Sequence, residues 1–119
     1  MIKIIFGIVF IAIGFCYAFA QDAKSGQKIF KTYCASCHGE KGKADGPASA
    51  TLNPKPPDLS DAHMMSTLSD EYLRKIIKGG GRAVGKSPVM PAWGSVLKEK
   101  DINDVIAFIR LICNCKYKK

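Results

Sequence analysis

The sequence is poor in acidic residues, in histidine and, beyond residue 20, in apolar residues. Its 119 residues include 10 Asp and Glu against 18 Lys and Arg, with only two His and one Trp. From residue 21 onward 39 of the 99 residues are apolar, whereas soluble domains usually have about 45–50%. A domain this small has a thin core, which a disulfide, a metal or a bound group often completes. The length also excludes a two-domain enzyme with its own cofactor-binding fold.

The first 20 residues differ from the rest, because they hold 17 apolar residues and a single charge, Lys3. Ala18-Phe19-Ala20 has the small-x-small pattern of a signal-peptidase site and is followed by polar residues. We therefore predict a signal peptide at 1–20, cleaved after Ala20, and a domain at 21–119 that is periplasmic and free of the membrane. The alternative is an uncleaved membrane anchor, since the uncharged run 4–20 has the minimum length for a spanning helix.

Four cysteines remain after the predicted cleavage, which removes Cys16. Exported cysteines usually form disulfides, but Cys34-Ala35-Ser36-Cys37-His38 is the C-x-x-C-H pattern of covalent haem attachment. Two thiols at this spacing add to the two vinyl groups of one haem, and His38 follows where its imidazole can bind the iron. A thioredoxin-like redox pair would need a βαβ context, and half of a zinc site would need a second ligand pair. We therefore predict one covalent haem c on Cys34 and Cys37.

An electron-carrying haem iron needs a second axial ligand opposite His38, and Met90 is the best candidate. It lies in a loop between Pro88 and Pro91, which restrict the backbone around it. A thioether ligand raises the reduction potential relative to two histidines. His63 is the alternative ligand, although a surface position or a contact with a haem propionate is the simpler explanation for it. Two other methionines, Met64 and Met65, are expected to cover the haem.

Three segments have helical patterns, at residues 22–33, 69–79 and 99–112, and each carries one apolar stripe. Between them, residues 39–60 and 79–95 are rich in Gly and Pro, which excludes regular helices there. No segment has a convincing strand pattern, and there is no internal repeat. The pattern predicts an all-α domain with three main helices, whose two long loops wrap a cofactor.

With these residues in place, the chain resembles the class I cytochrome c family over nearly all of residues 21–119. The resemblance rests on the residues around the C-x-x-C-H motif and on three further segments: Asp45-Gly46-Pro47-Ala48 with Pro56-Pro57-Asp58-Leu59, Val89-Met90-Pro91-Ala92-Trp93-Gly94, and Asp104-Val105-Ile106-Ala107-Phe108-Ile109. It implies the cytochrome c fold, and it implies that Gly26 allows a close helix crossing against Phe108.

The expected function is transfer of single electrons between redox partner proteins through a His38/Met90-ligated haem iron, without catalysis. The excess of basic residues favours partners with acidic docking patches. Nucleic-acid binding is disfavoured, because the basic residues form no compact run with interleaved aromatics. Two alternatives remain open: a sensor that binds a gas or peroxide at a labile sixth site, and a fixed haem relay in a larger respiratory complex.

Cys113-Asn114-Cys115 lies outside the family pattern. One interpretation is an intrachain disulfide across a single residue, which would require the last helix to end by Cys113. A second is a disulfide-linked or complexed partner held through Cys113 and Cys115. A third, in which a thiolate replaces Met90 on the iron, would change the protein from carrier to sensor.

Overall fold

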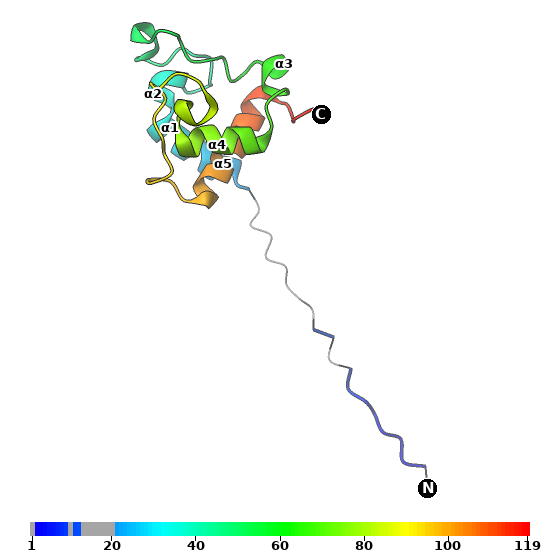
Figure 1. Cartoon of the computed structure of the whole chain (residues 1–119). Helices are drawn as coiled ribbons and strands as arrows, with labels where there is room; N and C mark the ends of the chain where they lie inside the picture. Colours follow the sequence, from blue (N-terminus) through cyan, green and yellow to red (C-terminus); the bar gives the residue numbers. More distant parts are fainter. Residues whose placement is uncertain (1, 10, 13–20) are drawn as a thin grey trace.

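The computed structural model describes residues 2–9, 11, 12 and 21–119. The expected cleavage site at Ala18–Ala20 and the residue Cys16 lie outside these residues. Within the described ranges every regular element is a helix, and no helix is long and apolar enough to span a membrane. The elements are α1 (Ala23–Tyr33), α2 (Ala35–His38), η1 (Ser49–Thr51), α3 (Ala62–Met65), α4 (Asp70–Gly79), η2 (Gly81–Val84) and α5 (Glu99–Cys113), as shown in Figure 1. The predicted all-α fold with three main helices is confirmed.

Helices α1 and α4 begin within one residue of the predicted positions, because a capping side chain defines the start of each. Asp22 caps α1 by accepting hydrogen bonds from the backbone N–H groups of Lys24 and Ser25. Ser69 caps α4 through a hydrogen bond from the Tyr72 N–H. Each cap satisfies donors that have no partner within the first turn of a helix.

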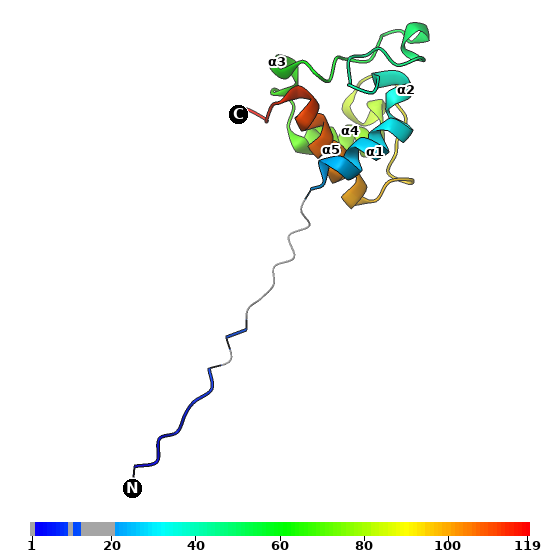
Figure 2. The same ribbon diagram turned by 180° about the vertical axis from the view of Figure 1, so that it is seen from behind.

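Helices α1 and α5 cross at close range and form the centre of the fold (Figure 2). A Cβ atom on Gly26 would lie 1.9 Å from the carbonyl oxygen of Asp104 and 2.9 Å from the Val105 nitrogen. The three nearest atoms thus belong to the α5 backbone, one turn before Phe108. Phe108 packs edge-on against Phe30 of α1, with 5.2 Å between the ring centroids.

A buried carboxylate fixes the start of α1 onto α5. Asp104 is 1% exposed, and one of its oxygens accepts a hydrogen bond from the Asp22 backbone N–H at 2.9 Å. The other oxygen pairs with the Lys100 ammonium at 2.6 Å. Because both oxygens have partners, the carboxylate can be buried without leaving an unsatisfied charge.

A second set of polar contacts joins α5 to the connection between α3 and α4. The Arg110 guanidinium donates to the carbonyl oxygens of Met65 and Leu68 and pairs with the Asp70 carboxylate. These contacts satisfy carbonyl groups at the end of α3 and hold the start of α4 against α5. The helices thus enclose a core to which α1, α4 and α5 contribute most of the apolar side chains.

Replacing Gly26 with alanine tests the helix crossing. The added methyl group would overlap the Asp104 carbonyl, so the helices must separate, and we expect Gly26→Ala to lower the free energy of unfolding by about 3 kcal/mol. Denaturant unfolding of the haem-loaded protein measures this. Lys28→Ala, on the exposed side of the same helix, is the control and should change stability by less than about 0.5 kcal/mol. Equal stability of the two variants would contradict the crossing.

Candidate haem site

The predicted attachment motif forms one continuous helical turn after α1. Cys34 is the C-cap of α1, and its backbone N–H donates to the Phe30 carbonyl. The short helix α2 follows, with the His38 N–H donating to the Cys34 carbonyl at 2.9 Å. Cys34 and Cys37 are both free thiols. The motif therefore holds the two thiols and the imidazole within five consecutive residues of one helical turn.

The loop after α2 folds back and fixes this segment. The Ala44 N–H donates to the His38 carbonyl at 2.9 Å, and the Ala48 N–H donates to the Ser36 carbonyl at 2.8 Å. The Leu59 N–H, at the far end of the loop, donates to the Gly42 carbonyl. The Gly/Pro-rich loop predicted to wrap a cofactor thus supports the backbone of the attachment motif.

Burial determines the protonation of the thiol and the imidazole. Desolvation, together with the neighbouring Cys37, raises the pKa of the Cys34 thiol to about 12. Redox-active C-x-x-C pairs and zinc ligands instead need a thiolate, which a lowered pKa provides. Desolvation also lowers the pKa of His38, which keeps the imidazole neutral and able to ligate a metal.

The donor set of this segment fits a haem. The Nδ1 atom of His38 is buried and has no hydrogen-bond partner among the described residues, so no protein group there holds the orientation of the ring through this atom. A bond to iron, together with covalent attachment on either side, would fix it. Two thiols, of which Cys34 has a raised pKa, and a neutral imidazole in five consecutive residues match haem attachment better than a redox pair or a zinc site.

The loop that carries Met90 is fixed to the end of α4 by backbone hydrogen bonds. The Gly81 N–H donates to the Met90 carbonyl at 3.1 Å, and the N–H groups of Trp93 and Gly94 donate to the Ile77 and Lys78 carbonyls. Gly80 has a φ of +74°, and a Cβ there would lie 2.8 Å from the Met90 carbonyl oxygen. Glycine is therefore required where the chain leaves α4 and meets this loop.

An aromatic pair joins the methionine loop to the attachment motif. The rings of Tyr33 and Trp93 lie 5.1 Å apart between centroids, at an angle of 58°. Tyr33 immediately precedes Cys34, and Trp93 is three residues after Met90. This contact brings together two predicted site segments that are more than 50 residues apart in the sequence. Trp93 belongs to the sequence motif of the methionine loop, but nothing in that motif indicates its contact with Tyr33.

The other candidate side chains, His63, Met64 and Met65, all lie on α3. His63 is exposed on α3. Met65 is fully buried in the core, and Met64 packs against the core from a partly buried position. The exposed position of His63 favours its interpretation as a surface residue.

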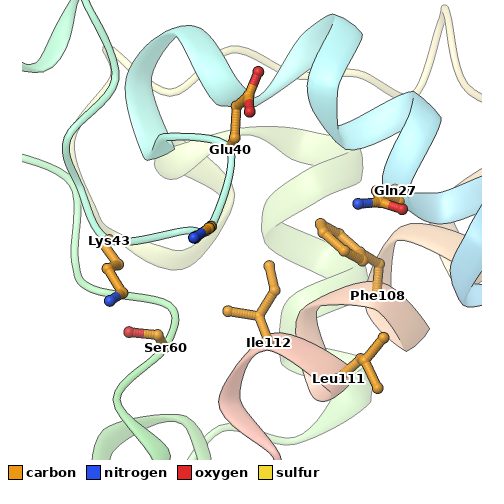
Figure 3. Close-up of a pocket in the computed structure, with 8 residues that line it drawn as sticks. Gln27, Glu40, Lys43, Ser60, Phe108, Leu111 and Ile112 are labelled. Atoms are coloured by element: carbon orange, nitrogen blue, oxygen red, sulfur yellow. The ribbon is translucent and has the colours of Figure 1, made fainter.

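A separate open hollow of about 330 Å³ lies between the loop after α2, α1 and α5. Figure 3 shows Glu40, Lys43 and Ser60 on the loop side, facing Phe108, Leu111 and Ile112 on α5. None of the predicted haem ligands lines it. The hollow is therefore distinct from the predicted haem site.

Cys113 and Cys115 form an intrachain disulfide at the end of α5. This is the first of the three interpretations drawn from the sequence. The bond uses both sulfur atoms, so in this state neither is available for a standing disulfide to a partner or as a thiolate on the iron.

Known proteins share this combination of fold and motif. The family model described as cytochrome C oxidase, cbb3-type, subunit III matches residues 21–109. Cytochrome c6 of Nostoc sp. is 34% identical over 113 residues, which cover 90% of this chain and 91% of that protein. The cbb3-type oxidase subunit FixP of Rhizobium etli is 34% identical over 93 residues, or 76% of this chain. The chain spans only 28% of the length of that FixP protein.

Solved structures agree on the fold. A chain of the Kuenenia stuttgartiensis reducing HAO-like complex Kustc0457/Kustc0458 has a TM-score of 0.59 and 27% identity, covering 75% of this chain and 41% of its own. The KustC0563 c-type cytochrome has a TM-score of 0.57 and 20% identity, covering 76% of this chain and 96% of its own. This chain belongs to the cytochrome c family that the matching model represents, and it is a class I c-type cytochrome. Its cofactor is a covalently bound haem c.

Paired serine substitutions test which cysteines carry the haem. We expect the denatured wild-type protein to have the mass of the polypeptide plus one haem. In Cys34→Ser/Cys37→Ser no thioether can form, and acid and organic solvent should extract any haem. Cys113→Ser/Cys115→Ser is the matched control and should retain the haem covalently. Haem retention in the first variant, or haem loss in the second, would place the attachment elsewhere.

Proposed function

We propose that this cytochrome is an electron carrier in which His38 and Met90 are the axial ligands of one haem on Cys34 and Cys37. The observation that carries the proposal is the Tyr33–Trp93 contact, which joins the attachment motif to the methionine loop. The haem, when bound, supplies the one-electron change at its iron. The chain itself supplies the ligands, excludes water and holds the loop rigid.

Several contacts support Met90 as the distal ligand. Its side chain is partly buried against the core, and its carbonyl group is held by the Gly81 N–H. Pro88 and Pro91 restrict the backbone on both sides, so the thioether is presented from a stiff loop. A rigid ligand set changes little between oxidation states, which suits repeated electron transfer better than ligand exchange.

Substitution of Met90 tests the assignment. We expect Met90→Ala to keep the haem attached, to lower the reduction potential and to produce high-spin character, because the soft sulfur ligand is lost. Added imidazole should then bind to the variant but not to the wild type, and absorption spectroscopy measures both changes. Met64→Ala removes a partly buried methionine side chain from α3 and should leave the spectrum unchanged. Imidazole binding to the wild-type protein would instead favour the small-ligand sensor.

Basic side chains flank the methionine loop. Arg82 and Lys86 are exposed and directly precede it, and the Lys86 N–H donates to the Gly81 carbonyl within the same turn. Positive charge near the point of electron exit would attract partners with acidic surfaces and raise the rate of encounter. We infer that redox partners dock at this side of the domain through such surfaces.

The charge dependence of electron transfer tests this docking side. Oxidation of the ferrous protein by the hexacyanoferrate(III) anion should slow several-fold in Arg82→Gln/Lys86→Gln at low ionic strength, and the difference should disappear at high salt. Lys118→Gln/Lys119→Gln removes the same charge from the C-terminus, beside α3 and away from α2 (Figure 1). Stopped-flow absorption measures the rates. Equal slowing in both variants would mean that net charge, and not a local docking side, controls the rate.

A fixed relay within a respiratory complex is the second candidate function. The similarity to FixP proteins, which are named as subunits of a cbb3-type oxidase, favours it, whereas the similarity to cytochrome c6 favours a separate carrier. Size-exclusion chromatography of a gentle membrane extract and of the matching soluble fraction distinguishes them. A carrier elutes alone from the soluble fraction, and a relay elutes with its complex.

We further propose that the protein is exported to the periplasm by the signal peptide 1–20. The apolar run, its small-x-small end and the haem attachment motif support this location. The intact mass that counts the haem also tests the cleavage, because a cut after Ala20 makes Gln21 the first residue. A mass that includes residues 1–20 would identify the segment as an anchor.

A further inference from the structure

The disulfide at the end of α5 lies away from the haem motif. The C-terminus is beside α3, whereas α2 with His38 is at the other side of the domain in both views (Figures 1 and 2). Cys113 is the last residue of α5, and its Cα atom is 5.2 Å from that of Cys115. Electron transfer through the proposed haem site does not use this pair, so its presence needs a separate explanation.

The backbone, and not the disulfide, positions the two cysteines. Asn114 has left-handed φ and ψ of 47° each, and its N–H donates to the carbonyls of Arg110 and Leu111. The Cys115 N–H also donates to the Arg110 carbonyl, at 3.2 Å. This is the usual way in which a left-handed residue ends a helix, and asparagine tolerates that conformation well. The hydrogen bonds do not depend on the sulfur–sulfur bond, so the cysteines would stay adjacent after reduction.

The disulfide also contributes little to the stability of the fold. The stabilisation that a disulfide gives by restricting the unfolded chain grows with the length of the loop it closes. Only Asn114 separates the two cysteines, so this bond closes a very short loop and leaves the rest of the chain unrestricted. Stability therefore gives little reason for the pair.

The two sulfur atoms have different surroundings. Cys113 is 4% exposed, whereas Cys115 is only partly buried. The Arg110 Nη1 atom lies 3.9 Å from the Cys115 Sγ atom, and a neighbouring guanidinium stabilises a thiolate. The Cys113 Sγ atom lies 3.5 Å from the Arg110 carbonyl oxygen, which can accept a hydrogen bond from a thiol at this position. The surroundings of the two sulfur atoms are thus compatible with both the oxidised disulfide and the reduced dithiol.

We propose that Cys113 and Cys115 form a thiol–disulfide exchange site that accepts two electrons from a dithiol protein through Cys115. A thiolate of the dithiol attacks Cys115 Sγ, the bond to Cys113 Sγ breaks, and Cys113 takes up a proton. The second thiol of the donor, once deprotonated, attacks its own sulfur in the mixed disulfide and releases the Cys115 thiolate beside Arg110, which then takes up a proton. In total one disulfide and one dithiol exchange two electrons and two protons.

Native reduction of the holoprotein tests the proposal, with dithiothreitol as the dithiol probe. Iodoacetamide trapping and peptide mapping should show two labels per chain, on Cys113 and Cys115, while circular dichroism shows an unchanged fold. In the reduced wild-type protein, brief labelling should modify Cys115 about tenfold faster than Cys113, because it is more accessible and lies beside Arg110. Labels on Cys34 or Cys37 would report unattached haem, which is a failure of the haem assignment and not of this site.

Single-thiol variants provide the control. Cys113→Ser leaves Cys115 and should form a mixed disulfide with oxidised glutathione, whereas Cys115→Ser leaves the buried Cys113 and should react about tenfold more slowly. Two results would overturn the proposal: a disulfide that resists dithiothreitol until the domain unfolds, or equal reactivity of the two sulfurs in the reduced protein.

Discussion

The fold depends on the close crossing of α1 and α5. At Gly26 the two backbones approach so closely that no side chain fits between Gly26 and the Asp104 carbonyl. The contact fixes the direction of α1, and α1 leads directly into the haem attachment motif. Asp104 holds the other end of the same helix through the Asp22 N–H. The position of Cys34, Cys37 and His38 is thus set by a packing contact that involves none of them.

The methionine loop depends on a second set of contacts, made by the end of α4. Backbone hydrogen bonds from Gly81, Trp93 and Gly94 fix the loop, and the Trp93 ring then meets Tyr33 at the end of α1. The two proposed axial ligands therefore lie on separate segments, one following α1 and one held by the end of α4, and the Tyr33–Trp93 contact joins these segments. A long loop without these hydrogen bonds and this aromatic contact would let the sixth ligand dissociate, which would suit a sensor better than a carrier.

Much of this arrangement follows from the sequence because its signals are local. The caps at Asp22 and Ser69, the apolar stripes and the C-x-x-C-H motif each lie within a few residues, and they predicted the helices and the covalent haem. The Tyr33–Trp93 pair and the Arg110 contacts join residues that are distant in the chain, so no local pattern identifies them. Gly26 was expected at a close crossing, but its neighbour is the Asp104 backbone, because the helix register that decides this depends on the whole core.

We propose that the Met90 thioether is the second axial ligand of the haem iron, together with His38. Proton NMR of the ferrous holoprotein with isotope-labelled methionine methyl groups tests it most directly, since the ring current of the haem shifts the methyl group of an axial methionine far upfield. Residues 21–119 contain three methionines, Met64, Met65 and Met90, so the variants Met64→Leu and Met65→Leu assign the shifted signal by elimination. We expect one strongly shifted methyl resonance, belonging to Met90. A shifted resonance from Met64 or Met65, or none at all, would contradict it.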